Sequence, residues 1–127
     1  MKNEIKYILA TLENAFLKLH EGVDLAQEDL QKDGVIQRFE FTFELLWKTL
    51  KIFLKEDGIE VKTPRESLKE AFRVGWINDE QVFLDMMEDR NKTSHIYDKE
   101  AASEIFQRIK MQYVKGIKEV LDKLKSK

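Results

Sequence analysis

The sequence contains no cysteine, a single proline and five glycines among its 127 residues. The lack of cysteine excludes disulfides and thiolate metal sites and fits a reducing compartment, so we expect a cytoplasmic protein. The scarcity of proline and glycine favours long helices over many short strands. No apolar run approaches the roughly 20 residues that cross a bilayer, and the first residues lack the apolar core of a signal peptide, so we expect no membrane partner.

The chain also lacks an excess of charge of either sign. Charged residues make up 36% of the sequence, yet the net charge is −2. This balance provides no overall positive field for a nucleic acid, so any such contact has to be local. The length predicts a single domain over residues 1–127, large enough to bury a core of its own.

Apolar residues recur three and four positions apart along most of the chain, which predicts amphipathic helices. We therefore predict an all-α antiparallel bundle of about five helices. Their approximate bounds are Asn3 to Leu30, Asp33 to Asp57, Pro64 to Val74, Asn78 to Asn91 and Asp98 to Lys123. The expected N-caps are Asp33, Thr63, Asn78 and Asp98, and Gly58 and Gly75 are expected to end the helices that precede them.

The second predicted helix is apolar on more than one side. Its main stripe includes Phe39, Phe43 and Leu46, while Phe41 and Ile52 lie off that stripe. A helix of this kind is usually buried on more than one side. Either it is central in the bundle, or its second side contacts another subunit. On the same helix, Glu44 and Lys48 stand four apart in the favoured order for an exposed ion pair.

Chemically versatile side chains gather between the last two predicted helices. Arg90 offers a planar cation suited to phosphate, and Asn91 offers an amide. The third residue is His95, and histidine is the side chain that changes charge near neutral pH. Lys92 and Lys99 add local positive charge. Arg90 and His95 are five positions apart, about 140° around an unbroken helix, so they converge only if the helix ends between them, near 93–94.

Such residues suit RNA cleavage without a metal or another cofactor. A base takes the proton of the ribose 2′-hydroxyl, a cation stabilises the charged phosphate, and an acid protonates the leaving 5′-oxygen. The reaction needs two proton transfers, and one chain offers a single histidine here. Two copies of the chain would supply a pair of histidines. His95 with Asp89 and Asp98 does not form a ligand set of known metal spacing. The alternative is structural: Arg90 pairs with a carboxylate and His95 caps the helix.

The order Arg90-Asn91, then His95, then Tyr97 resembles the signature of the HEPN superfamily. The stretch 33–48, rich in phenylalanine, is similar to one branch of it, the nucleotidyltransferase substrate-binding proteins, which are related to the HepT toxins. The resemblance covers nearly the whole chain. It implies a homodimeric helical bundle that partners a small nucleotidyltransferase.

The resemblance also implies an activity, with RNA and not DNA as the substrate. In active HEPN toxins the arginine and histidine are the ribonuclease residues, which here are Arg90 and His95, with Asn91 as a polar helper. In HepT systems the nucleotidyltransferase antitoxin silences the toxin by attaching AMP to the tyrosine, here Tyr97. A second reading follows from the name of the branch: a non-catalytic subunit that binds substrate or nucleotide for a nucleotidyltransferase.

Overall fold

The computed structural model describes residues 1–95 and 98–127, and every regular element in them is helical. In chain order the elements are α1 (Asn3–Leu25), α2 (Asp29–Glu56), α3 (Pro64–Arg73), α4 (Glu80–Lys92), the 3₁₀ turn η1 (Thr93–His95), α5 (Lys99–Arg108), the π-helical segment η2 (Ile109–Tyr113) and α6 (Val114–Lys125). Because η2 joins α5 and α6 end to end, the described residues form five helical rods. The predicted all-α bundle is confirmed.

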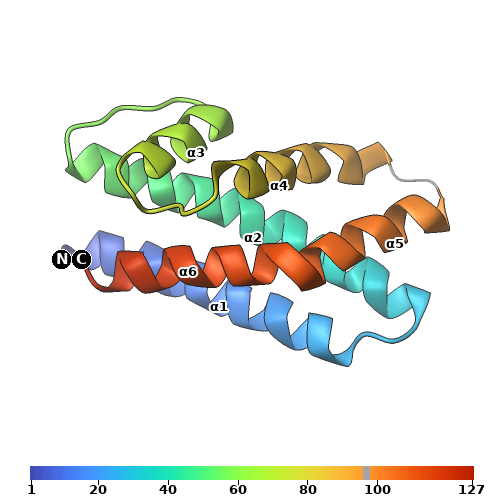
Figure 1. Ribbon diagram of the computed structural model, residues 1–127. Helices are drawn as coiled ribbons and strands as arrows, with labels where there is room; N and C mark the ends of the chain where they lie inside the picture. The colour runs from blue at the N-terminus through green and yellow to red at the C-terminus, as the bar shows by residue number, and fades with distance from the viewer. Residues whose placement is uncertain (96–97) are drawn as a thin grey trace.

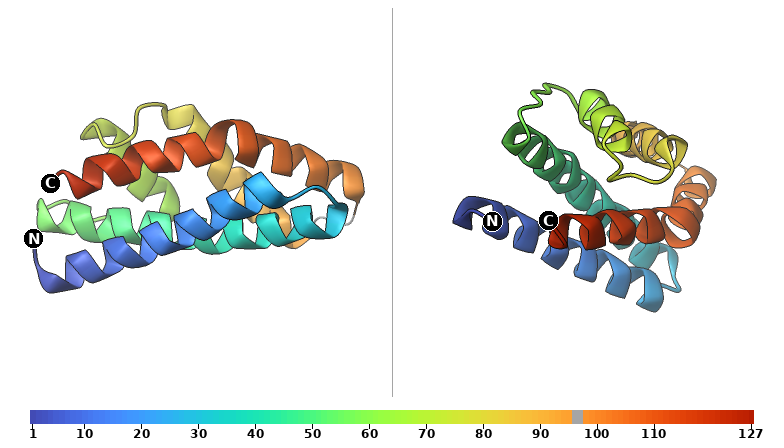
Figure 2. Two further views of the ribbon diagram at one scale, coloured as in Figure 1. Left: turned by 90° about the horizontal axis from the view of Figure 1, so that it is seen from below. Right: turned by 60° about the vertical axis from the view of Figure 1, so that its left-hand side comes forward.

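The long helix α2 occupies the middle of the bundle. It contacts α1, α3, α4 and α5, while α6 packs on α1 (Figure 1). Both chain termini lie at one end of the bundle, and the junction between α4 and α5 lies at the other (Figures 1 and 2). The central position of α2 explains why its sequence is apolar on more than one side.

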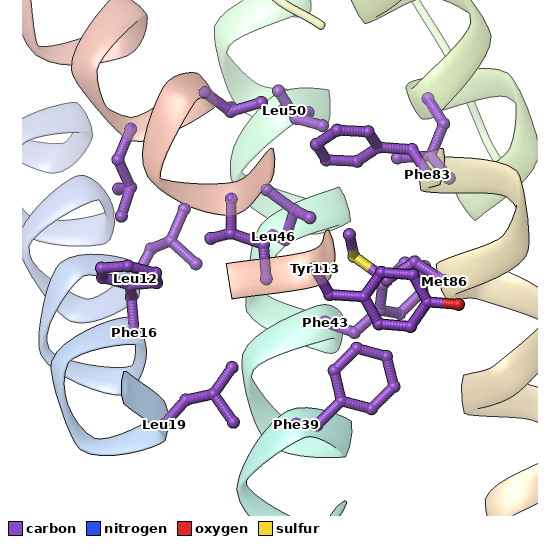
Figure 3. Packing of buried hydrophobic residues seen from close by; sticks show 14 of the residues in the cluster. Leu12, Phe16, Leu19, Phe39, Phe43, Leu46, Leu50, Phe83, Met86 and Tyr113 are labelled. Atoms are coloured by element: carbon purple, nitrogen blue, oxygen red, sulfur yellow. The ribbon is translucent and has the colours of Figure 1, made fainter. Parts of the chain in front are cut away.

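The core is built around the main stripe of α2. Phe39, Phe43 and Leu46 are almost completely buried between α1, α4 and the last helix (Figure 3). Off the stripe, Ile52 is half-buried against the core, whereas Phe41 stays 61% exposed. Neighbours within the chain therefore account for much of the second apolar side, and Phe41 is the part that they leave uncovered.

The boundary between the first two helices differs from the prediction. α1 ends at Leu25, and α2 begins at Asp29 instead of after Asp33. Glu28 caps α2 and exchanges hydrogen bonds with Gln31, so two otherwise unpaired backbone N–H groups are satisfied at once. Leu30, which the periodicity assigns to the buried stripe of the first helix, is 82% exposed.

Most of the other predicted helix ends are confirmed. Thr63 caps α3 and Asp98 caps α5 through their side-chain oxygens, and Gly58 and Gly75 follow helices with φ of 81° and 89°. The cap of α4 is Asp79, one residue after the predicted Asn78. None of the helices in the described part of the chain is both long and apolar enough to cross a membrane.

Candidate functional site at the end of α4

The chain tightens at the end of α4, close to the predicted break. α4 ends at Lys92 and continues as the single 3₁₀ turn η1, and the Thr93 hydroxyl donates to the Arg90 carbonyl over 2.7 Å. The change of pitch turns the chain before the connection to α5. Tyr97, the predicted modification site, lies outside the residues that the structure describes.

Arg90 points from α4 toward α2. Its Nη1 lies 3.8 Å from the Glu40 carboxylate and its Nε lies 3.5 Å from that of Glu44. These distances are long for hydrogen bonds, and the buried Nε has no hydrogen-bond partner in the described chain. Glu44 also accepts from the Trp47 indole N–H at 3.1 Å, so it faces Arg90 and Trp47 and not the expected Lys48. Arg90 is thus paired with carboxylates but loosely held.

Asn91, Lys92 and His95 line one groove of about 560 Å³ that runs between the end of α4 and the length of α5. All three side chains are exposed. Ala101 and Ile105 supply an apolar part of the wall. Arg90 does not line this groove, because it projects from α4 toward α2. Within one chain, the structure therefore brings the predicted amide, lysine and imidazole together and leaves the predicted arginine apart.

Lys99, the remaining predicted phosphate contact, lies at the first turn of α5. Its ammonium group pairs with Asp29 at the start of α2, at 2.6 Å. The hydrogen bond and charge of Asp29 raise the pKa of Lys99. Lys99 and Asp29 line a second, smaller cavity of about 290 Å³ rather than the His95 groove.

Asp89 forms a cluster that the sequence did not predict. Its carboxylate is 3% exposed and accepts two hydrogen bonds from Arg108, from Nε at 2.7 Å and from Nη2 at 2.8 Å. The Tyr113 hydroxyl donates to the same carboxylate, and Figure 3 shows the phenol ring packed beside Phe39 with its oxygen toward α4. Asp89 thereby accepts three hydrogen bonds, two from Arg108 and one from Tyr113.

Both donors of the cluster, Arg108 and Tyr113, are stabilised in their protonated forms. The hydrogen bonds to Asp89 raise the pKa of Arg108 still further above its usual range. Burial, and then the hydrogen bond to Asp89, raise the pKa of the Tyr113 phenol. Arg108 also lines the groove of His95. The sequence did contain one signal for this cluster. Asp89 falls three residues after the apolar Met86, and a carboxylate on a buried stripe needs a hydrogen-bond donor elsewhere in the chain.

Comparison with known proteins identifies the fold and the family. The model of the family described as nucleotidyltransferase substrate binding protein like matches residues 7–126. Over 81 residues the chain is 37% identical to the probable ribonuclease HepT of Haemophilus influenzae, covering 60% of this chain and 56% of that protein. The chain thus spans a little over half the length of this curated relative.

Solved structures show the same bundle. A protein of Thermus thermophilus superposes with a TM-score of 0.83 at 35% identity, covering 89% of this chain and 98% of the other. A Haemophilus influenzae protein, described as the fold of a substrate binding domain of a nucleotidyltransferase, gives 0.81 at 29%, covering 92% and 98%.

A more distant structure has the same fold. A tri-AMPylated HEPN toxin of Shewanella oneidensis, in complex with its MNT antitoxin, gives a TM-score of 0.80 at 16% identity and full coverage of both chains. The match over nearly the whole chain confirms the resemblance on which the sequence prediction rested. The chain belongs to the nucleotidyltransferase substrate binding protein-like family, a HEPN-like group of helical bundles.

Proposed function

We propose that the protein is a metal-independent endoribonuclease of the HEPN type. The observation that carries this proposal is the groove at the end of α4, where the His95 imidazole, the Asn91 amide and the Lys92 ammonium line one concave surface. A relative with 37% identity is named a probable ribonuclease. Imidazole, amide and cation are the groups that RNA cleavage by an internal nucleophile requires.

The proposed reaction is a transesterification at phosphorus. One imidazole accepts the proton of the ribose 2′-hydroxyl, and the 2′-oxygen forms a bond to the adjacent phosphorus. The bond from phosphorus to the 5′-oxygen breaks, and a second acid protonates that oxygen. The products are a 2′,3′-cyclic phosphate and a 5′-hydroxyl. Arg90 stabilises the negative charge on the phosphate oxygens during the step.

Two copies of the chain supply the groups that one copy does not bring together. The groove of one chain contains a single histidine, and Arg90 lies outside it. We propose a homodimer whose cleft combines the His95 residues of both subunits with Arg90. A monomer by light scattering at micromolar concentration, in a sample that cleaves RNA, would remove this shared cleft.

Silencing by a nucleotidyltransferase is the proposed regulation. Tyr97 stands two positions after His95 in the sequence. Transfer of AMP from ATP to its hydroxyl, with release of pyrophosphate, would add a bulky anion close in sequence to His95. The structural relative described as a tri-AMPylated HEPN toxin shares the fold. Incubation with the cognate enzyme and ATP should add the mass of AMP to the parent protein and not to Tyr97→Phe.

A second candidate function is a non-catalytic subunit that binds substrate or nucleotide for a nucleotidyltransferase. The specific observation in its favour is that Arg90 already faces Glu40 and Glu44, so its charge is compensated within the chain. The family description names substrate binding, and so does that of the Haemophilus structure. This function predicts a stable complex with the nucleotidyltransferase and no RNA cleavage by either protein alone.

RNA cleavage by the purified protein in the presence of a chelator tests the proposal. The parent should cleave, and His95→Ala should not. The matched control is His20→Ala: His20 is the other histidine, exposed on α1 and 3.8 Å from Asp24. The intact mass of each sample is recorded, because protein that carries AMP would be the silenced form. No cleavage by protein of unmodified mass would favour the binding subunit.

A further inference from the structure

Arg108 is a cation that the fold fixes at the wall of the His95 groove. Two of its five N–H donors are used by the buried Asp89 carboxylate. The guanidinium has three further N–H donors, and the side chain keeps 36% of its surface exposed. The geometry points to Arg108 as the phosphate-binding residue of this groove, an inference that rests on the proposed ribonuclease function.

The position of Arg108 depends on the π-helical segment. Arg108 and Tyr113 are five residues apart, and in a regular α-helix such residues point about 140° away from each other. In η2 the Val114 N–H bonds the Ile109 carbonyl, one residue further back than in an α-helix. The wider turn brings Arg108 and Tyr113 to the same side, where both donate to Asp89. Single π-turns of this kind often lie at functional sites.

The cluster also ties the groove together. Asp89 directly precedes Arg90 and Asn91 on α4, and Arg108 ends α5, so their ion pair joins the two helices that form the walls. Arg108 therefore reaches the groove from α5, whereas Asn91 reaches it from α4 and His95 from the turn η1 that follows α4. An RNA strand that lies along the groove would pass both the His95 imidazole and the Arg108 guanidinium.

The charges around the groove indicate that an anion would be bound by an oriented hydrogen-bond donor and not by the net charge of the groove. Besides Lys92 and Arg108, the groove is lined by Glu88, Asp98 and Glu104. Because these carboxylates cancel the field of the cations, an anion gains little from the groove as a whole. Asp98 is occupied as the cap of α5, accepting from the Ala101 N–H at 2.7 Å. Binding of RNA then depends on a donor that is already oriented, and Arg108 is the one that the fold holds in place.

The salt dependence of RNA binding separates a phosphate contact from a structural role. Binding of a fluorescent single-stranded RNA is measured by anisotropy at several salt concentrations, with His95→Ala as the reference so that the RNA stays intact. Each phosphate contact with a single strand contributes about 0.7 to the slope of log affinity against log salt. Adding Arg108→Gln should lower this slope by about 0.7 and weaken binding about tenfold at low salt.

The control and the folding of the variants are part of the test. Arg73→Gln removes an exposed arginine of α3, which is also paired with a carboxylate, Glu70, and should leave the slope unchanged. If Arg108→Gln fails to fold, Asp89→Asn with Arg108→Gln removes the buried carboxylate charge together with the cation. Arg108→Lys keeps the charge and should keep the slope while losing the two-pronged geometry.

The outcomes for Arg108 and for the ribonuclease function are distinguishable. An unchanged slope in folded Arg108→Gln, or no RNA binding by the reference protein, overturns the role of Arg108. Weaker binding with an unchanged slope and a lower melting temperature makes Arg108 structural, which also overturns it. A lower slope in a protein that never cleaves RNA supports the phosphate contact and contradicts the ribonuclease.

Discussion

Two neighbouring residues of α4, Asp89 and Arg90, form ion pairs of opposite character. Asp89 is buried and makes short hydrogen bonds of 2.7 and 2.8 Å to Arg108. Arg90 lies 3.5 and 3.8 Å from two half-buried carboxylates and keeps an unsatisfied Nε. The first contact fixes the end of α4 on α5. The second leaves a cation that can exchange its partner.

The two ion pairs differ in strength because breaking them costs different amounts of free energy. A buried carboxylate without its donors costs several kcal/mol, so the Asp89 cluster has one stable arrangement. Arg90 and its partners are partly exposed, and pairs of that kind contribute about 1 kcal/mol or less. Under the proposed function, a phosphate of RNA would therefore compete for Arg90 at a small cost. The Asp89 contact thus holds α4 against α5, and in the proposed function the Arg90 contact leaves a cation that RNA can engage.

The largest expected effect is the loss of cleavage on removal of the loose cation. Arg90→Ala should lower the rate of metal-free RNA cleavage by about 100- to 1,000-fold, the usual cost of losing one donor to a developing negative charge. Its free energy of unfolding should change by no more than about 1 kcal/mol. Initial rates and urea denaturation check both. If Arg90→Ala lost several kcal/mol of stability and still cleaved RNA, Arg90 would be structural and not catalytic.

Removal of the fixed cation should have the larger effect on stability. Arg108→Ala leaves the Asp89 carboxylate buried without its main donor, and we expect a loss of about 3 kcal/mol in the free energy of unfolding. The control Lys118→Ala breaks an exposed ion pair with Asp122 on α6 and should cost no more than about 0.5 kcal/mol. Equal losses in the two variants would show that the buried pair is no stronger than a surface one.

The third hydrogen bond of the cluster should contribute less and should depend on pH. Tyr113→Phe removes one donor to a charged acceptor, which we expect to cost about 1.5 kcal/mol. Because the fold raises the pKa of Tyr113 above its ordinary value of about 10, its contribution is complete below about pH 10 and is lost as the pH rises further.

Urea denaturation on both sides of about pH 10 measures this effect. The parent should lose more stability than Tyr113→Phe over this range. Tyr7→Phe, which alters a tyrosine that is 76% exposed, serves as the control and should behave as the parent does. Parallel curves for the parent and Tyr113→Phe would contradict the raised pKa.

The smallest expected effect is a gain in RNA affinity when Arg90 is released. Glu40→Gln or Glu44→Gln removes a carboxylate that competes with phosphate, so binding in the inactive His95→Ala background should tighten about fivefold, or roughly 1 kcal/mol. Glu56→Gln, at the far end of α2 beside Lys2, should have no effect. Weaker binding in the first two variants and not in the third would mean that these carboxylates position Arg90 instead of competing for it.

Local signals predicted most of the fold. The stripe of α2 and the caps Thr63 and Asp98 were identified correctly because periodicity and capping depend on residues close in sequence. The start of α2 was wrong because Asp33 is a common N-cap residue and Glu28 is not, and the cap at Glu28 depends on its reciprocal bonds with Gln31. The alternative that Arg90 pairs with a carboxylate agrees with the structure, and its partners lie about fifty residues earlier on α2.

The remaining part of the candidate site depends on contacts distant in sequence. Arg108 joins Asp89 across 19 residues, and the π-helical turn that aligns it with Tyr113 has no simple sequence pattern. The Tyr113 ring is buried in the core, and its hydroxyl donates to Asp89, a contact that helical periodicity does not indicate. The HEPN resemblance located Asn91 and His95, and the structure places them in one groove.

The ends of the RNA products test the central claim most directly. A defined RNA is incubated with the parent protein of unmodified mass in excess chelator, and the new termini are identified by mass spectrometry. Attack by the 2′-hydroxyl predicts 2′,3′-cyclic phosphate and 5′-hydroxyl ends, which should be absent with His95→Ala. Uncleaved RNA, or products that end in a 3′-hydroxyl, would contradict a metal-independent ribonuclease at the end of α4.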